Sequence, residues 1–459
     1  MPPTLPAELK LAIAESVRLQ PGQYPRMATL QSLSLVSSAW STAAQIALFH
    51  RIEMTSSEAM DQIVETLLAS PSLARYVQEM ELRIYRRYTN FLSRHTVDED
   101  NGLPCLSDIL DIISLLPNLA KLSIEGGLLT LGLPLVVAPS LAKRRRLEVL
   151  QLTDLDTTSD ALDSLFCHFA PSTLRILGCC SVYPSHQGDS GDTQSAWSFD
   201  DSTLCSTVQR LEINRECVFV SVSDNVSALE PFSRGTPHLL NILECPLLYS
   251  RRGLTAFAAL LENGLGCHLT ELSLIFSGYA KGDMLIRHSY ADEKSTEQAN
   301  DAFGPIPYPQ SLSISLATAC PHLKFLSLSL PLFSQPLFVS MLVLPEWQYA
   351  LRLITSANPF PLTRITIRMV DPMEALIDLD QATIFGKLNW NHLDAVLDSY
   401  AALRTFEIVF TEPWNAENRS SQTATLPASF KLDEYLEEQM PGCAARGLIH
   451  VGSIEASPT

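Results

Sequence analysis

A short apolar phrase, L-x-x-L-x-L or a close variant, returns at intervals along the 459 residues of this chain. Its last two apolar positions lie two residues apart, so in an extended strand they point to one face, while their neighbours point to the other. One face can then build a core, and the opposite face stays free for contacts. The clear copies begin at Leu119, Leu147, Val208, Leu269, Leu323, Leu362 and Leu403.

The spacing of the copies predicts a repeat array. With weaker copies at Leu174 and Leu239, successive starts lie between 27 residues (147 to 174) and 54 residues (269 to 323) apart. An early, imperfect unit at Val77-Met80-Leu82 begins the series. A period of this order is typical of a solenoid, in which each repeat buries its apolar face against its neighbours.

Stretches with a helical spacing of apolar residues separate the phrases, and each leads into the next strand through a proline or polar turn. Strand, loop and helix in a constant order predict an α/β fold with parallel strands. The expected helices cover 58–69, 106–116, 160–169, 253–263, 310–320, 346–356 and 390–402.

Composition narrows the possible partners. The chain carries 50 acidic and 32 basic side chains, a net charge of −18, which disfavours general attraction to nucleic acid or to anionic membranes. We therefore expect protein partners. Two long uncharged stretches, 126–142 and 325–345, are interrupted by prolines, so buried repeat core explains them better than membrane spans.

Cysteine usage and the first residues bear on the compartment. The ten cysteines include no C-x-x-C pair and form no dense framework, which is typical of reduced thiols. The apolar stretch from Leu9 to Val17 is interrupted by Lys10 and Glu15 and has no basic leader, so we expect no signal peptide. The expected location is cytoplasmic, nuclear or both.

Residues 1–52 lack the phrase and show a helical period instead. Pro6 suits the first position of a helix, and Glu8 suits its positive end. A polar break at 20–26 separates two apolar patterns, and the second pattern reads as one helical run. The first pattern comprises Leu5, Leu9, Ile13 and Val17, and the second Leu33, Val36, Trp40, Ala44 and Leu48.

These first 50 residues resemble an F-box. The resemblance rests on three stretches: Leu5-Pro6-Ala7-Glu8-Leu9, Leu33-Ser34-Leu35-Val36-Ser37-Ser38-Ala39-Trp40, and Leu48-Phe49. In that family the first two motifs bind a small Skp-family linker protein, which attaches the F-box protein to a cullin ubiquitin ligase. The residues that the resemblance assigns to the linker are Leu5, Pro6, Glu8, Leu9, Ile13, Leu33, Val36, Trp40 and Phe49.

The downstream repeats look like the degenerate leucine-rich repeats of many fungal F-box proteins, so the resemblance covers most of residues 4–410. The chain departs from both patterns. The polar break is longer than a compact F-box has, and no Asn or Cys ladder follows the strands, which predicts an irregular array. An alternative for the N-terminal helices is that they only cap the solenoid.

The residues beside the buried strand positions would line the concave face and hold a target protein. Their mixture of charges, hydroxyls and apolar groups suits a protein surface, although any solvated strand face has a similar mixture. The target-binding candidates are Lys121, Ser123, Gln151, Arg210, Glu212, Glu271, Phe325, Arg364, Arg368 and Glu407.

Catalytic and metal chemistry finds little support. The Cys-His pairs at 167–168 and 267–268, with Cys320 near His322, lie at helix ends or strand starts and lack ligand spacing, so we interpret them as core thiols and turn histidines. The basic run 143–146 reads as a loop leading into a strand, with a nuclear localisation signal as the alternative. We expect no enzyme activity, no metal and no cofactor.

The predicted organisation is an F-box-like helical module at 1–52, a solenoid at 53–447 and a frayed tail at 448–459. Polar insertions are expected near 184–202, 279–308 and 411–425. The expected function is that of a substrate-recognition adaptor, which joins an unidentified target to a Skp-family linker and, through it, to a cullin. A repeat scaffold that binds proteins without any ligase is the alternative.

Overall fold

The computed structural model divides the chain into two compact units. The first comprises Met1–Val208 and Glu216–Phe219, and the second Gln209–Arg215 and Val220–Thr459. The residues that the structure describes are 5–19, 23–83, 106–129, 144–177, 181–183, 207–213, 229, 239–248, 257–277, 315–331, 343–357, 361–370, 388–411 and 432–455.

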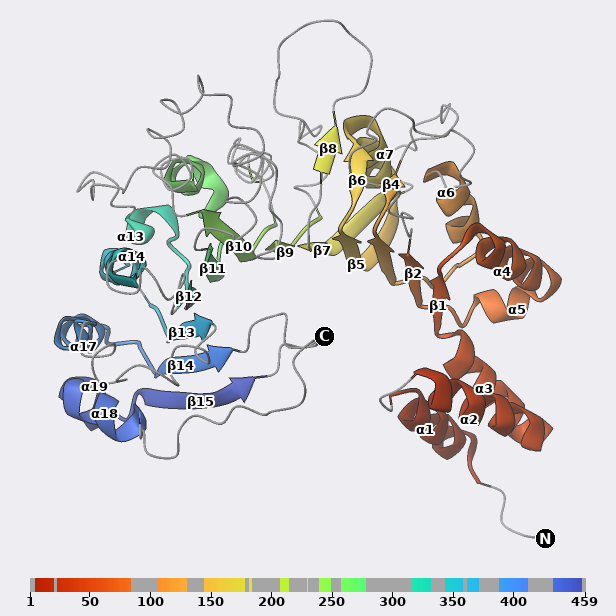
Figure 1. The fold of residues 1–459 in the computed structure, drawn as a ribbon, viewed down its shortest axis with the longest axis horizontal. Coiled ribbons are helices and arrows are strands. Elements are labelled where there is room, and N and C mark those ends of the chain that lie inside the picture. The colour runs from red at the N-terminus through yellow and green to blue at the C-terminus, as the bar shows by residue number, and fades with distance from the viewer. Residues whose placement is uncertain are drawn as a thin grey trace, which may run out of the picture. The chain divides into compact units, whose positions relative to one another are not determined.

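The first unit begins with three helices that pack against one another: α1 (Ala7–Arg18), α2 (Gln23–Val36) and α3 (Ser38–Phe49) (Figure 1). Small residues at the contacts let the helix backbones approach closely. The buried core of this helical module consists of Ala14, Leu30, Ala43 and Ala47, with Val17, Leu33 and Leu48 packed against it.

Two expectations for this module were wrong. The polar break ends earlier than predicted, because α2 already begins at Gln23. Arg26, in the first turn of α2, donates a hydrogen bond to the carbonyl of Arg18 (3.3 Å) and so caps the end of α1. The second apolar pattern is also split between two helices, because Ser37 is extended (φ −165°).

The rest of the first unit alternates strands and helices. The strands of its main sheet pair in parallel and in chain order, which is the predicted arrangement. The strands of the main sheet are β1 (Arg51–Met54), β2 (Glu79–Arg83), β3 (Lys121–Glu125), β5 (Arg145–Thr153) and β7 (Phe169–Leu177). A second, small parallel sheet consists of β4 (Leu128–Leu129), β6 (Asp156–Thr158) and β8 (Ser181–Tyr183). The helices are α4 (Ser57–Ala69), α5 (Pro71–Ala74), α6 (Leu106–Ser114) and α7 (Ser159–His168).

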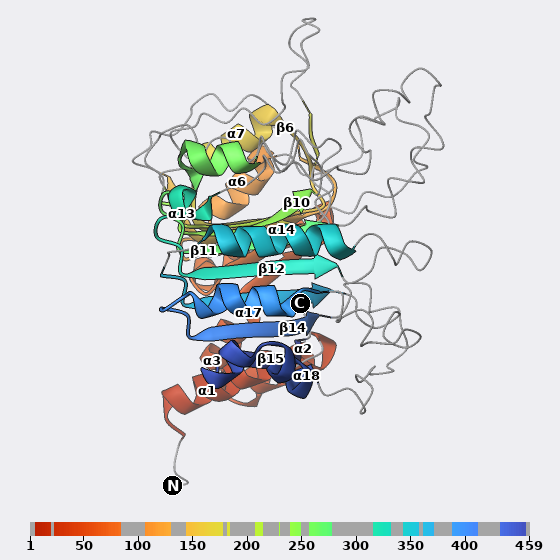
Figure 2. The same cartoon turned by 90° about the vertical axis from the view of Figure 1, so that its left-hand side faces the viewer.

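The second unit continues the same order of elements, again with parallel pairing throughout the described strands. Helices α14 and α17 lie against the same face of its sheet (Figure 2). Its strands are β9 (Arg210–Ile213), β10 (Ile242–Leu248), β11 (Glu271–Ser277), β12 (Phe325–Pro331), β13 (Arg364–Val370), β14 (Thr405–Thr411) and β15 (Ile449–Glu455); its helical elements are the π-helical turn η3 (Leu261–Leu265), α13 (Leu316–Ala319), α14 (Val343–Ser356), α17 (Trp390–Asp398), α18 (Leu432–Gln439) and α19 (Pro441–Ala445).

The repeated phrase builds the core as predicted. Leu326 and Leu328 of β12 are buried and pair in register with Ile365 and Ile367 of β13, which are also buried. Matching positions of consecutive repeats therefore stack into continuous apolar rows under the sheet. The predicted fold class, an α/β chain with an N-terminal helical segment followed by stacked parallel strands, is confirmed.

Backbone groups connect the strand starts, where the sequence offers no Asn ladder. The carbonyl of His50 accepts hydrogen bonds from the amides of both Gln78 and Glu79 (2.9 and 3.0 Å). In the second unit, the carbonyl of Lys324 accepts from the amide and the hydroxyl of Thr363 (2.9 and 3.2 Å). One carbonyl of each repeat thus holds the start of the next strand, which satisfies groups that a side-chain ladder would otherwise satisfy.

Side-chain caps start several of the helices. The hydroxyl of Ser56 accepts a hydrogen bond from Ala59 N–H (3.2 Å) at the start of α4. The side-chain oxygen of Asn389 likewise accepts from His392 N–H (3.2 Å) at the start of α17. Each cap satisfies an amide that has no partner within its helix.

The prediction of a frayed tail at 448–459 was wrong for residues 449–455, which form β15. Ile449 and Val451 pair with Phe406 and Ile408 of β14, and Leu448 is buried. The free edge of β14 offers a row of backbone donors and acceptors, so even a segment without the phrase gains hydrogen bonds there. The polar insertions expected at 184–202 and 279–308, and residues 412–425 of the third, lie outside the described residues.

Two details of the repeats also differ. The predicted module boundary at residue 52 falls inside β1, where Ile52 and Met54 are buried and continue the phrase from Phe49. In β10 the phrase begins at Leu240 and not at Leu239, since Leu240 is buried and Leu239 is exposed. A shift of one residue exchanges the two faces of a strand, so the register had to follow the buried residue.

The helix expected at 253–263 continues as η3 to Leu265, with Gly264 at a positive φ of 116°. Gly266 follows η3 and lies against the end of α13. A Cβ atom there would lie 2.2 Å from the carbonyl oxygen of Ala319. Only glycine allows this approach.

Candidate functional site

Helix α1 presents large apolar side chains to solvent. Leu9 and Ile13 of α1 are 53% and 42% exposed, and Leu5, which lies just before the helix, is 41% exposed, whereas Ala14 is buried in the module core. Residues four apart lie on one face of a helix. The apolar face that the sequence predicted therefore exists, and it points away from the module that carries it.

The end of α2 adds two more exposed apolar residues. Leu35 is 85% exposed and Val36 is 69% exposed. Val36 was predicted, and Leu35 was missed, although it stands inside the same Leu-Val motif. Its position directly before Val36, within the motif already assigned to the linker, was the sequence signal that could have found it. We call Leu5, Leu9, Ile13, Leu35 and Val36 the exposed apolar set.

The other predicted linker residues have mixed positions. Pro6 and Glu8 are exposed at the start of α1. Trp40 and Phe49 are half-buried in α3, and Leu33 packs against the module core, so it is used by the module itself. Part of the predicted linker set is therefore exposed, whereas Leu33 packs inside the module and is not available to a linker.

Helix α3 connects the module to the repeats. It contacts α5 and β1, and His50 follows it directly into β1. Ala44 is fully buried in this helix. Of the three helices, α3 therefore covers the start of the repeats, while the apolar residues of the exposed set belong to α1 and α2.

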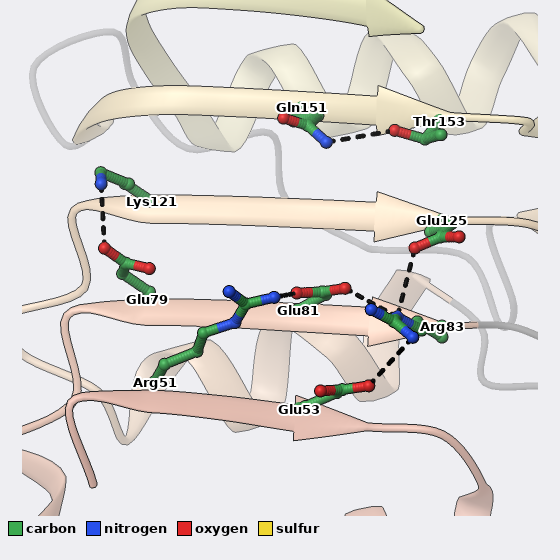
Figure 3. A network of polar contacts seen from close by, with 9 residues as sticks. All are labelled: Arg51, Glu53, Glu79, Glu81, Arg83, Lys121, Glu125, Gln151 and Thr153. Atoms are coloured by element: carbon green, nitrogen blue, oxygen red, sulfur yellow. Dashed lines mark hydrogen bonds and ion pairs between the residues drawn. The ribbon is translucent and has the colours of Figure 1, made fainter. Parts of the chain in front are cut away.

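The sheet face of the first unit that bears the predicted target residues is an ion-pair network (Figure 3). Arg83 of β2 contacts three carboxylates: Glu81 (2.7 Å), Glu53 (3.2 Å) and Glu125 (3.3 Å). Arg51 forms a second ion pair with Glu81. One guanidinium thus bridges β1, β2 and β3, and most of its donors are already engaged.

The same face holds Lys121 of β3, whose ammonium donates to the Glu79 carboxylate (2.9 Å), and Gln151 of β5, whose amide donates to Thr153 (3.3 Å). His50 Nε2 lies 3.5 Å from the same Glu79 carboxylate. Ser123 is half-buried and lies in register between Glu81 of β2 and Gln151 of β5. These predicted target residues therefore lie on one face, but Lys121 and Gln151 are already paired with the neighbouring side chains of Glu79 and Thr153.

The pKa values of two carboxyl groups in this network, Glu79 and Glu125, are shifted in opposite directions. Burial raises the pKa of the Glu79 carboxyl, but the hydrogen bond and charge of Lys121, with His50 and Arg51, bring that pKa below its usual value. Burial raises the pKa of Glu125, Arg83 lowers it, and nearby carboxylates raise it further, so the net direction is upward. Carboxylates slightly outnumber their cations around Arg83.

On the corresponding face of the second unit, some of the predicted residues form ion pairs with one another. Arg364 of β13 pairs with Glu407 of β14 (2.5 Å), and Thr366 donates to the same carboxylate (3.3 Å). Arg210 and Glu212 pair within β9. The remaining predicted residues are Glu271 and Arg368, both half-buried, and Phe325, which is 39% exposed.

The basic run at 143–146 has a structural use. Arg145 donates hydrogen bonds to the carbonyls of Ile113 (2.7 Å) and Leu116 at the end of α6. A cation at a helix C-terminus satisfies carbonyls that have no partner within the helix. One of the four basic residues is therefore a cap.

The buried thiols are poorly suited to nucleophilic chemistry. Burial, and then the neighbouring Cys267, raise the pKa of Cys320 to about 12, so its thiolate is scarcely populated. His168 Nδ1 lies 2.8 Å from the carbonyl oxygen of Ser164 and so has a backbone partner. Within the described ranges, no group of three or more His, Cys, Asp and Glu side chains is placed to hold a metal ion.

A search of the described residues finds no helix with both the length and the apolar character needed to cross a bilayer.

Comparison with known proteins yields little. No family model matches this chain, and no curated protein matches it. A similar solved structure is the crystal structure of the Rad7 and Elc1 complex in yeast, at 16% sequence identity and a TM-score of 0.25, with 79% of this chain and 88% of that chain covered. At that TM-score the likeness carries no argument.

Proposed function

We propose that this protein is a substrate-recognition adaptor of a cullin-type ubiquitin ligase. Its α1 and α2 would bind a Skp-family linker protein, and its strand faces would hold a target. The single observation that carries the proposal is the exposure of Leu9 and Ile13 on one face of α1, together with that of Leu5 just before the helix. Those residues belong to the motif that resembles an F-box.

Large apolar side chains that stay in contact with water cost free energy. Complete burial of a fully exposed leucine or isoleucine contributes about 1.5–3 kcal/mol, and Leu5, Leu9 and Ile13 each have about half of that still to gain. Together they form a site for a partner groove. Monomeric proteins rarely leave several large apolar residues together on a helix. A linker that covers this face would recover that free energy.

The alternative role of a cap fits α3 better than α1. A cap buries its apolar side against the first repeat, and α3 does contact β1 and α5. Leu9 of α1 and Leu35 of α2 remain more than half exposed. The exposed apolar set is therefore not explained by capping.

The proposed mechanism is proximity. The module would hold the linker and thereby the cullin, and the strand faces would hold the target within reach of the transfer machinery, so this chain need not make or break bonds itself. The target residues remain those predicted on the faces of β3, β5, β9 and β11–β14. A cytoplasmic or nuclear location accompanies this proposal.

The test is a pull-down of the full chain with a purified Skp-family linker. Leu9→Asp places a charge in the proposed interface and should abolish detectable binding. Leu68→Asp is the matched control, because Leu68 is 61% exposed on α4, outside the module. It should bind the linker as the wild type does.

Melting curves of both variants establish that they fold. If folded Leu9→Asp retains wild-type linker binding, the proposal is wrong. If the wild type itself does not bind any Skp-family linker, the scaffold without a ligase becomes the better account.

A further inference from the structure

Strands β11, β12 and β13 of the second unit carry polar atoms without partners on the face away from the helices. The hydroxyls of Ser273 and Ser327 and the Nε of Arg368 are buried, and none of them makes a hydrogen bond. Ser273 and Ser327 are direct neighbours in register, and Arg368 lies opposite Ser329 of β12. Native structures leave few such groups unpaired, because each costs about 1–3 kcal/mol.

Exposed side chains surround these atoms. Phe325 of β12 is 39% exposed, and the Arg364 side chain, directly opposite it in register on β13, is 51% exposed. An aromatic side chain and an arginine are the residue types that most often anchor protein interfaces. This face therefore combines two accessible anchors with donors that lack acceptors.

The local charge favours an anionic partner. Arg364 and Arg368 lie on one face of β13, four residues and thus roughly 13 Å apart. Glu407 neutralises Arg364, whereas no ion pair joins Arg368 to any other described residue. Glu271, opposite Phe325 on β11, lies on the far side of β12 from the arginines. The end of β13 at Arg368 thus offers an unneutralised cation.

We propose that the face of β11–β13 binds an acidic segment of a partner protein that places a carboxylate on Arg368 and an apolar side chain on Phe325. Polar groups of the segment would accept from the Ser273 and Ser327 hydroxyls, and movement of the long exposed side chains above them would admit it. A lysine-rich segment fits poorly, because it would leave Arg368 facing a like charge. The inference concerns the target side of the proposed adaptor and does not require the linker.

The experiment selects a displayed pool of random short peptides on the full-length protein. The expected result is an enrichment of Asp and Glu next to Leu, Ile or Phe. For the best binder, Arg368→Gln should weaken binding at least tenfold by fluorescence anisotropy. The matched control is Arg75→Gln, which removes an exposed cation at the end of α5 in the first unit, outside the predicted target residues, and should leave the affinity unchanged.

A second variant separates binding from structure. Ser327→Ala removes a buried hydroxyl that has no partner, so the melting temperature should hold or rise while the affinity falls about threefold to tenfold. A purely structural serine would leave the affinity unchanged.

Several outcomes would overturn the proposal. These are enrichment of basic peptides, the absence of any enriched peptide, or an Arg368→Gln variant that folds and binds as the wild type does. Binding of a phosphoserine peptide but not of its glutamate counterpart would also reject the carboxylate. Arg368→Gln should still bind the linker, and Leu9→Asp should still bind the peptide, so the two proposals fail independently.

Discussion

The first and the last helices of the chain use their apolar residues in opposite ways. In α17, α18 and α19 the large apolar residues Trp390, Leu393, Leu397 and Leu436 are buried against their own unit. In α1 and α2 the corresponding large residues, such as Leu9 and Leu35, face solvent, and the core is made largely of alanines. Each group contacts a sheet through one of its helices, α18 through β15 and the N-terminal group through α3 and β1, so the presence of a neighbouring sheet does not account for the difference.

Polar contacts sharpen this contrast. The buried Asp394 carboxylate of α17 accepts from the amides of Gly442 (2.9 Å) and Cys443 (2.8 Å) at the start of α19. Arg446 returns to the end of α17 and donates to the carbonyls of Tyr400 (2.9 Å) and Leu397 (3.3 Å). These contacts join α19 and Arg446 to α17 and the residues that follow it.

The C-terminal helices α17–α19 bury their large apolar residues within their own unit, whereas α1 and α2 keep apolar surface that a partner could cover. Stability should therefore be concentrated in the C-terminal group, and binding in the N-terminal group. Four predictions test this division, beginning with the largest effect.

Truncation of leucines should separate the two groups most clearly. Leu393→Ala creates a cavity in a fully buried site and should lower the free energy of unfolding by about 2–5 kcal/mol. Leu9→Ala should change it by less than about 0.5 kcal/mol, because its side chain is already half exposed. Urea unfolding of the full chain measures both. Equal losses for the two variants would break the comparison.

Asp394→Ala should be the next most damaging change. It leaves the Gly442 and Cys443 amides without their acceptor, which should cost about 2–3 kcal/mol. Asp394→Asn is the control, since it keeps one oxygen acceptor and should lose less. Linker binding should be the same in both variants. If Asp394→Ala were as stable as the wild type, the hydrogen bonds from Gly442 and Cys443 to Asp394 would not contribute to stability.

Arg446→Met should cost about 1–2 kcal/mol, because it keeps the apolar stem but removes donors to the carbonyls at the end of α17. Hydrogen exchange of the α17 amides should accelerate, whereas exchange in α1 should not change. Acceleration in α1 alone would contradict this assignment.

The smallest effect concerns the attachment of the N-terminal group, where Glu79 lies close to His50 and Lys121. The pKa of Glu79 is lowered in the folded state, so its contribution is present above the unfolded pKa and is lost as the pH falls through the folded value. Glu79→Gln should therefore destabilise by less than about 1 kcal/mol at about pH 7, and by less still at about pH 3.

Glu125 provides a control of opposite sign. Its pKa is raised, so its contribution is present below the unfolded pKa and is lost as the pH rises through the folded one. Glu125→Gln should leave stability equal or slightly higher at neutral pH, measured by the same urea titrations. A matching loss in both variants would mean that the network acts only through its hydrogen bonds.

Much of the fold was predictable because the repeated phrase states which residues share a strand face. Leu326 and Leu328 follow it and are buried, and the expected helices at 58–69 and 346–356 form with small shifts at their ends. The predictions failed where a segment departs from the phrase, as in β15. They also failed where two adjacent leucines, Leu239 and Leu240, could both start it.

The candidate sites were less predictable. The four-residue spacing of Leu5, Leu9 and Ile13 predicts one shared helix face, and the structure places Leu9 and Ile13 on α1 with Leu5 just before it. An amphipathic helix can turn such a face inward or outward. Ala14 and Val17 supply the competing inward face. On the sheets, Lys121 and Arg368 are similar strand residues in sequence, yet one has an ion-pair partner and the other does not.

The amino-acid sequence by itself determined the period of the repeats, the order of strands and helices, and the sets of residues that share a face, because those follow from local backbone geometry. Only the tertiary structure decided which of these faces are covered. Leu9 and Leu393 are chemically identical, and their roles differ because neighbours surround one of them and leave the other to solvent.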